Sequence, residues 1–405
     1  MPLCRLRSTV IIIVIGCCLL LLTTAAAAEE SVDRHEDDGA SIQNELVNKQ
    51  LQQIDTNDIE QYWQQIYRDY NGFLPETESP SVFDVILNSR EGFDIKGTLS
   101  GFLNYFVYEI VQNLKLLGTI AVLAVFCMVL KYMQTAFEQN TVSKVAYAVS
   151  YLVLIILAIN SFAVAMEAAK SAISSMVHFM LALIPLVLTL LGTMGNFASM
   201  AMFHPLIIFL VHFIGTIVYT VIFPLLFFSV VLGIVSSYAE QYPLTNLAKL
   251  LRNVSISALG IFLTVFLGVV SVQGAATAVT DGVTIRTAKY VTGNFVPVIG
   301  GLFAEAADTV VGASLLVKNA VGMTGVIILL FICAFPALKI LALAFIYSFT
   351  GAVMQPLGDS PIINCLETIG KGMITIFAAM ATVGLMFFIA LTIMITAGNV
   401  SVMMR

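Results

Sequence analysis

The sequence predicts an all-α integral membrane protein, a polytopic helical bundle that carries a signal peptide and a small acidic extracytoplasmic helical head. Three observations predict this fold class. Hydrophobic residues make up 59% of the 405 residues and charged residues only 11%, whereas a soluble domain is about 25% charged. Long apolar runs recur from Leu114 onward, and acidic and basic residues gather in different parts of the chain. A chain so poor in charge must turn apolar surface toward lipid.

The amino terminus has the pattern of a signal peptide. Arg5 and Arg7 precede an apolar run over residues 10–22, and small residues follow up to Ala28. A positive segment, an apolar run and a small-residue cleavage site in this order are typical of secretory signals. We therefore expect residues 1–28 to be removed. Lipid attachment at Cys17 and an uncleaved anchor remain open as alternatives.

Charge divides the remaining chain into two parts. Residues 29–113 hold 17 acidic and 5 basic residues, a net charge of −12, whereas residues 114–405 hold 8 acidic and 12 basic residues, a net charge of +4. We therefore expect an acidic extracytoplasmic segment over residues 29–113 and a polytopic transmembrane domain over residues 114–405. Because no basic stripe with interleaved aromatic residues occurs, no nucleic-acid partner is expected.

Two helical regions are predicted in the acidic segment. Apolar residues recur every three to five positions over residues 45–70, which indicates one or two short amphipathic helices. A further amphipathic helix is predicted over residues 95–114, lying along the membrane surface. Three aromatic residues are candidates for partner docking: Tyr62, Trp63 and Phe73. The alternative, which we prefer, is that these aromatic residues pack against neighbouring parts of their own chain.

Five apolar runs are long enough for one membrane crossing each, which requires about 20 residues: Leu114–Met133, Val145–Met166, Met176–Met194, Val254–Val272 and Met373–Ala397. Two more runs, 203–238 and 321–354, are too long for one crossing and short for two. Each is predicted to form a pair of short spans or a re-entrant hairpin, broken at Pro224 or Pro336, because proline removes a helix hydrogen bond. The two proline-containing units would form an inverted repeat, an arrangement that often marks a transport pathway; chance similarity between apolar segments stays open as the alternative.

The basic residues indicate the orientation. If the acidic head is extracytoplasmic, the loop with Lys131 and Lys144, the loop with Lys249 and Arg252, and the terminal Arg405 all fall in the cytoplasm. Cytoplasmic loops of membrane proteins are enriched in Lys and Arg. We therefore expect a multi-pass protein of the cell membrane with a cytoplasmic carboxyl terminus.

Sequence signatures of catalysis are missing. There is no Walker loop, dinucleotide fingerprint, His-Glu-x-x-His or Gly-x-Ser-x-Gly pattern, and these motifs carry phosphate, cofactor, zinc and nucleophile chemistry. His204 and His212 lack the carboxylate or cysteine partners of a metal site. We expect no enzymatic activity, no cofactor and no metal.

Ionisable residues in apolar surroundings are the candidates for function, because such groups are costly in a membrane unless they are paired or hydrated. Lys339 either belongs to a pathway, by lining it or by pairing with an acid such as Asp308 or Glu305, or contacts water at the turn of a short hairpin. Asp281 and its neighbours form either a solvated loop or a buried polar network. Both pairs of alternatives stay open. The candidate pathway or polar network comprises Lys339, Pro336, Pro224, Asp281, Arg286, Lys289, Asp308 and Lys318.

Several runs resemble a known family. They are Phe-Leu-Gly-Val-Val-Ser-Val-Gln-Gly-Ala from Phe266, Asp-Gly-Val-Thr-Ile-Arg-Thr-Ala-Lys from Asp281, Gly-Asn-Phe-Val-Pro-Val-Ile-Gly from Gly293, Cys-Ala-Phe-Pro-Ala-Leu-Lys-Ile-Leu from Cys333, and Gln-Pro-Leu-Gly-Asp from Gln355. These runs resemble the stage III sporulation protein AE family, and the resemblance extends from about Tyr62 onward. It implies a role in endospore-forming bacteria, beside other stage III proteins that form a channel-like apparatus in the mother-cell membrane around the engulfed forespore. It implies no catalytic residues.

The expected function is that of a membrane subunit of a sporulation channel or transport apparatus between mother cell and forespore, needed for late forespore development. The alternative is a non-conducting membrane scaffold that assembles this apparatus. The resemblance implies other stage III sporulation membrane proteins as partners, beside the lipid bilayer, and it leaves a homo-oligomer open.

Overall fold

The computed structural model describes residues 57–74, 95–136, 141–238, 244–295, 299–358 and 360–403, all within one compact unit that begins at Lys49. The described residues are helical apart from short turns and include no strand. This confirms the all-α class. The predicted signal peptide and the beginning of the acidic segment lie outside the described residues.

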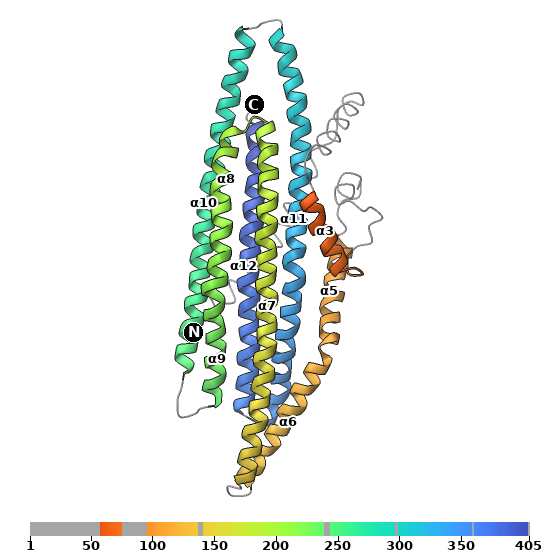
Figure 1. Cartoon of the computed structure of the whole chain (residues 1–405), viewed down its shortest axis with the longest axis vertical. Coiled ribbons are helices and arrows are strands. Elements are labelled where there is room, and N and C mark those ends of the chain that lie inside the picture. Colours follow the sequence, from red (N-terminus) through yellow and green to blue (C-terminus); the bar gives the residue numbers. More distant parts are fainter. Residues whose placement is uncertain are drawn as a thin grey trace. The chain divides into compact units, whose positions relative to one another are not determined.

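The described helices follow one another from the acidic segment to the carboxyl end (Figure 1). They are α3 (Asn57–Asp69), α5 (Ile95–Gln112), α6 (Leu114–Ala136), α7 (Thr141–Thr193), α8 (Phe197–Ile217), the π-helix η1 (Val218–Ile222), α9 (Phe223–Tyr238), α10 (Thr245–Phe295), α11 (Ile299–Met354), the 3-10 helix η2 (Gln355–Leu357) and α12 (Pro361–Met403). Six helical segments of the described chain are long and apolar enough to cross a membrane: Leu114–Gln134, Lys144–Thr193, Phe197–Ser237, Thr245–Thr284, Thr309–Met354 and Pro361–Ala397. Their number indicates a multi-pass membrane protein.

The two spans predicted at 145–166 and 176–194 are one continuous helix. Helix α7 has 53 residues, so it is about 80 Å long, far longer than the roughly 30 Å of the hydrocarbon core. The predicted gap between these spans, residues 167–175, contains Glu167 and Lys170. These residues continue the helix instead, since alanine, glutamate and lysine all favour helical backbone and no glycine or proline interrupts them.

The predicted breaks at the two prolines are also wrong. Helices α8 and α9 are joined without reversal by η1, and the π-helix ends two residues before Pro224. Proline lacks an N–H and its ring collides with the carbonyl four residues earlier, and the wider π-helical turn leaves room for this ring. Helix α11 continues through Pro336. Neither apolar run forms a hairpin or a pair of short spans.

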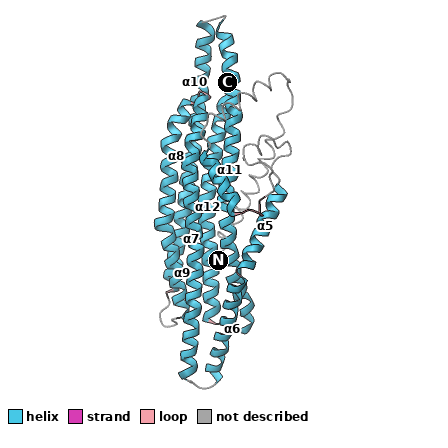
Figure 2. Ribbon diagram, turned by 45° about the vertical axis from the view of Figure 1, so that its right-hand side comes forward, coloured by secondary structure: helices cyan, strands magenta, loops and turns pink. Residues whose placement is uncertain are grey.

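Helix α12 forms the centre of the bundle. It packs against α7, α9, α10 and α11, which surround it in both views (Figures 1 and 2). Met373, Met380, Phe387 and Met394 of α12 are completely buried. The helix is apolar around its whole circumference along this stretch, which is typical of a helix enclosed by others.

The helix ends alternate between the two ends of the bundle. Figure 1 shows that α6, α9 and α11 end where α7, α10 and α12 begin, and that α12 finishes at the opposite end. The expected cytoplasmic groups around Lys131 and Lys249 therefore share one end, but the carboxyl terminus lies at the other. If each helix crosses the membrane once, the loops near Lys131 and Lys249 lie on one side and the end of α12 lies on the other. The predicted cytoplasmic location therefore cannot hold for both these loops and the carboxyl terminus. Because α9 and α11 run in the same direction, the predicted inverted repeat is wrong as well.

Candidate functional site

Two buried charges lie at the end of the bundle where α8 begins and α12 finishes. Asp281 of α10 is 1% exposed and Lys318 of α11 is 0% exposed. Both belong to the residues that the sequence singled out. Asp281 itself is buried within a helix and does not lie in a solvated loop, whereas Arg286 is exposed.

Asp281 caps the beginning of α8 from a neighbouring helix. Its Oδ1 accepts a hydrogen bond from the backbone N–H of Ala198 at 2.9 Å, and its Oδ2 accepts one from the N–H of Ser199 at 3.0 Å. The first N–H groups of a helix have no partner within the helix, and Asn196, at the cap position, makes no side-chain capping bond. A carboxylate is also stabilised by the positive end of the helix dipole. Asp281 therefore fastens α10 to α8.

Lys318 caps the other kind of helix end, because it donates hydrogen bonds to the last turns of α12. Its Nζ donates to the backbone oxygen of Ile395 at 2.7 Å and to Oδ1 of Asn399 at 2.5 Å. A cation suits the negative, carboxyl-terminal end of a helix. One turn further along α11, a Cβ on Gly322 would lie only 2.4 Å from a side-chain atom of Ile395, which shows how closely the two helices approach. Lys318 therefore fastens α11 to α12.

Together the two charges bind the long helices α10 and α11 to the ends of their shorter neighbours. Each charge is enclosed and uses its hydrogen bonds within the chain, so the geometry gives both a positioning role. The sequence analysis missed Asn399, although a polar side chain at the end of an apolar run was a usable signal.

We expect Lys318→Ala to lower the free energy of unfolding more than Lys318→Met. Alanine leaves a cavity and two acceptors without their donor, which costs roughly 3 kcal/mol, whereas methionine fills most of the volume. Thermal unfolding of the purified chain in detergent, followed by circular dichroism, measures both effects. Equal midpoints for the two variants and the parent would contradict the fastening role.

The remaining predicted charges are not brought together with this pair. Arg286 is exposed on α10. Lys289 lies on α10 and Asp308 on α11, and the side chains of both are outside the described part of the structure. Lys339 is partly buried on the continuous helix α11, like Pro336. Asp308 and Lys339 are 31 residues apart on this helix, so about 46 Å separates them and an ion pair between them is impossible.

The π-helix brings a cation and an aromatic ring together halfway along the bundle. Lys170 Nζ of α7 lies 4.8 Å from the ring centroid of Tyr219 in η1. This distance is typical of a cation–π interaction. Pro224 marked the region from the sequence, but the pairing across helices could only be seen in the structure.

The aromatic residues of the acidic segment pack against the bundle. Trp63 is 8% exposed and its ring lies 6.2 Å from that of Phe331 in α11. The ring of Tyr62 meets Phe179 of α7 at 5.3 Å, and that of Phe73 meets Tyr105 of α5 at 5.2 Å. All three docking candidates thus have contacts within their own chain, and partner docking stays a hypothesis.

Helix α5 packs along α11 and not flat on a membrane surface as predicted. The ring of Tyr105 contacts Phe335 at 5.0 Å, and that of Phe106 contacts Phe345 at 6.4 Å, ten residues further along α11. Tyr70, just after α3, stacks on Phe335 with 3.8 Å between ring centroids and 8° between planes. Aromatic pairing thus joins the described part of the acidic segment to the transmembrane helices.

We expect this aromatic contact to loosen in alkali. Burial, followed by the charges of Asp69 and Glu109, raises the pKa of Tyr70 from 10.0 to about 12. Burial and a hydrogen bond to Glu109 also raise the pKa of Tyr105. Because the folded pKa is above the unfolded value, the stabilisation is complete below pH 10 and is lost as the pH rises toward about 12.

Acrylamide quenching of Trp63, the chain's one tryptophan, measures this loosening. Quenching should increase between pH 10 and 12 in the parent and later in Tyr70→Phe, which keeps the ring but cannot ionise there. An unchanged pH dependence in Tyr70→Phe would contradict the assignment to Tyr70.

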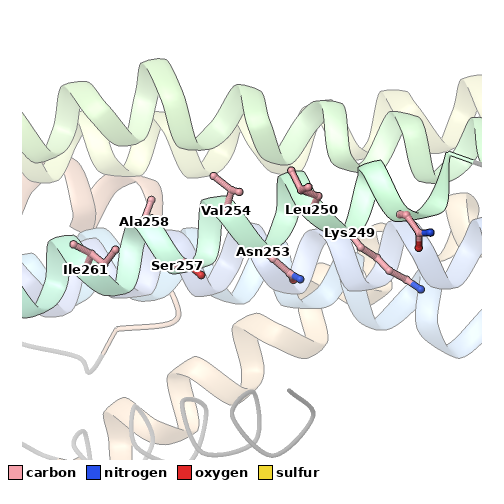
Figure 3. A pocket seen from close by; sticks show the side chains of 8 residues that line it. Lys249, Leu250, Asn253, Val254, Ser257, Ala258 and Ile261 are labelled. Carbon is pink, nitrogen blue, oxygen red and sulfur yellow. The ribbon is translucent and has the colours of Figure 1, made fainter. Parts of the chain in front are cut away.

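A groove of about 580 Å³ runs along the outside of α10 (Figure 3). One row of its residues is polar and the neighbouring row is apolar: Asn246, Lys249, Asn253 and Ser257, and Leu250, Val254, Ala258 and Ile261. All eight residues come from one helix, so the groove is a surface feature and not an enclosed chamber. In the described part of the chain, no group of three or more His, Cys, Asp or Glu residues could hold a metal ion.

Comparison with known proteins gives a consistent result. A family model described as stage III sporulation protein AE matches residues 78–398. The chain is 50% identical over 369 residues to the stage III sporulation protein AE of Bacillus subtilis (strain 168). The aligned residues cover 91% of this chain and 92% of that protein. No solved structure matches.

Proposed function

Because the chain belongs to the stage III sporulation protein AE family, we propose that it is a membrane subunit of a sporulation channel between mother cell and forespore. Membership in the family supports a role in sporulation and in a complex of stage III proteins. The conducting role, and the mother-cell membrane around the forespore as its location, are our proposal.

The observation that carries the conducting role is an exposed carboxylate halfway along an apolar helix. Glu167 lies on the outer surface of α7, between residues 145–166 and 171–193, which contain no Asp, Glu, Lys or Arg. It forms no ion pair with any described residue. An ionised carboxylate facing lipid costs several kcal/mol, so this surface faces water or a polar partner.

Within the described residues, the interior of one copy offers no pathway. The central helix α12 is enclosed by apolar side chains, and Asp281 and Lys318 are engaged as helix caps. A passage for solutes would therefore lie along an outer face of the bundle, shared with other subunits. We also propose that the ends near Lys131 and Lys249 are cytoplasmic, as the positive-inside rule favours, which places the carboxyl terminus on the extracytoplasmic side.

Solute flux into proteoliposomes tests the conducting role, with the purified chain alone and together with its co-encoded stage III proteins. We expect flux in at least one preparation, and we expect Glu167→Ala to reduce it strongly. Val265→Ala, on an exposed apolar face of α10, is the matched control and should leave flux unchanged. Absence of flux from both preparations, with partner binding retained, would favour the scaffold.

The scaffold is the second candidate because one observation favours it. The described acidic segment is packed firmly on α7 and α11 through Tyr62, Trp63 and Tyr70, so a partner bound to this segment would be held rigidly against the membrane helices. Under this alternative, Glu167→Ala would leave sporulation unchanged, whereas disruption of α3 would prevent assembly of the complex.

A further inference from the structure

The outer face of α7 carries a polar stripe. Glu167, Ser171, Ser174 and His178 are all exposed, and their spacings of four, three and four residues place them on one side of the helix. The hydroxyl of Ser174 approaches Nδ1 of His178 at 3.5 Å. No described residue outside the stripe hydrogen-bonds to these four side chains. We call these four residues the α7 stripe.

The α7 stripe lies in the apolar layer of the bundle. On α11, residues 319–338 between Lys318 and Lys339 contain no charge and are about 30 Å long, the thickness of the hydrocarbon core. Gly384 of α12 packs against both Cys333 of this segment and Met176 of α7. Met176 lies between Ser174 and His178, so the stripe extends into the same layer.

A second polar surface lies beside the stripe. The residue after His178 is Phe179, which is covered by Tyr62 of α3. The opposite side of α3 is exposed and carries a shallow hollow of about 370 Å³. The hollow is lined by Gln61, Gln64, Gln65, Arg68 and Asp69. A helix with this surface cannot face lipid. Two independent observations, the α7 stripe and the outer side of α3, therefore indicate water at the same depth.

The outer face of α10 differs at this depth. Gly274 of α10 packs on Ile393 of α12, and these two helices run parallel (Figure 1). Nine residues earlier on the two helices are Val265 and Gly384, so these two residues lie at the same level. Because Gly384 packs against Met176, Val265 is also level with Met176. Val265 is 55% exposed, and the exposed large side chains that flank it on α10 are apolar: Ile261, Val269 and Val272. This side suits lipid, so the polar surface does not extend to the outer face of α10 at this depth.

A dry contact between two copies does not suit the α7 stripe. Copies in one membrane share their orientation, and a two-fold axis along the membrane normal brings each residue near its own counterpart. Glu167 would then face Glu167, and like charges in a poorly hydrated contact are destabilising. Water between the copies removes this penalty.

We propose that the α7 stripe and the outer side of α3 line a water-filled passage between copies of this chain. The proposal rests on the conducting function proposed above and specifies which surface conducts. The solutes that fit it are small and hydrophilic, because the lining combines hydroxyl, amide, imidazole and charged groups. Val265 and its neighbours on α10 face the lipid.

Cysteine accessibility tests the passage in the full chain, reconstituted in liposomes with its partners. Ser171→Cys and Ser174→Cys report on the stripe, and Val265→Cys is the control at the same depth. The reaction of the parent's own cysteines with the reagent is measured separately and subtracted. Two of these cysteines, Cys127 and Cys365, are completely buried. We expect an anionic, membrane-impermeant thiol reagent to modify Ser174→Cys at least ten times faster than Val265→Cys, with both variants as monodisperse as the parent.

Three results would overturn the passage. An unreactive Ser174→Cys that forms a disulfide between copies would show a dry interface. An unreactive Ser174→Cys without such a disulfide would show lipid or another protein over the stripe. Equal reactivity of Ser174→Cys and Val265→Cys would show that the whole layer is in water.

The flux experiment separates this inference from the proposed function. Flux with an unreactive stripe would refute the passage and leave the conducting role standing. A reactive stripe without flux would refute the conducting role and leave the water-facing surface standing.

Discussion

Asp281→Ala is expected to lower the free energy of unfolding by roughly 3 kcal/mol, because it removes a charged acceptor from two hydrogen bonds at once. The N–H groups of Ala198 and Ser199 at the beginning of α8 would lose their partner in a buried place. The favourable interaction of the carboxylate with the α8 dipole would be lost as well. Asp281→Asn keeps one acceptor atom and should lie between the parent and Asp281→Ala.

The unfolding midpoint of purified variants in detergent, at a fixed heating rate, measures this effect. Thr284→Ala is a matched control, because Thr284 lies on the same helix, is exposed, and donates only to the backbone oxygen of Thr280. If Asp281→Ala unfolds at the same temperature as Thr284→Ala, the cap contributes nothing to stability. If Asp281→Asn matches the parent, the charge is unimportant and only hydrogen bonding counts.

Gly101→Ala is expected to separate α5 from the turn that follows α3. A Cβ at Gly101 would lie 1.9 Å from the backbone oxygen of Phe73, and a backbone atom cannot rotate away as a side chain can. Gly72, with a φ of +92°, lies in this turn and needs the freedom of glycine. The displacement would break the ring contacts of Phe73 and Tyr70 with Tyr105, at a cost of about 3 kcal/mol.

Fluorescence of Trp63 reports this separation directly. Acrylamide should quench Trp63 several-fold more strongly in Gly101→Ala, since the residue would lose its shielded place beside Phe331. Gly118→Ala is the matched control, because nothing lies within 4 Å of a Cβ at that position of α6; alanine should slightly stabilise its helix. Parental quenching in Gly101→Ala would show that α3 does not depend on the contact between α5 and this turn.

Predictions from local patterns succeeded where the signal was the polarity of single segments. The all-helical class followed from the apolar runs, and Asp281 and Lys318 stood out because a charge in apolar surroundings needs a partner. The identity of those partners did not follow, since Ala198, Ser199, Ile395 and Asn399 are distant in sequence and three of the four bonds are made to backbone groups. Backbone N–H groups carry no sequence signal.

Predictions failed where a local signal was interpreted as a break in a helix. Residues 167–175 were expected to lie between two spans, but they continue α7. The sequence predicts that Pro224 and Pro336 break their apolar runs into a pair of short spans or a re-entrant hairpin, but packing against α12 and a π-helical turn keep both helices continuous. Tertiary contacts along a long helix outweigh the few kcal/mol that one proline costs.

That this chain is a helical membrane protein of the stage III sporulation protein AE family could be inferred from sequence alone, because composition, apolar run length and family motifs are properties of the chain. The contacts between helices were needed to show which charges are caps, that α3 and α5 lie against α11, and which surface of α7 is exposed and polar. These are relations between helices. They depend on the register in which apolar surfaces pack, and that register is set by contacts such as Gly322 on Ile395 and Gly384 on Met176, which no single segment encodes.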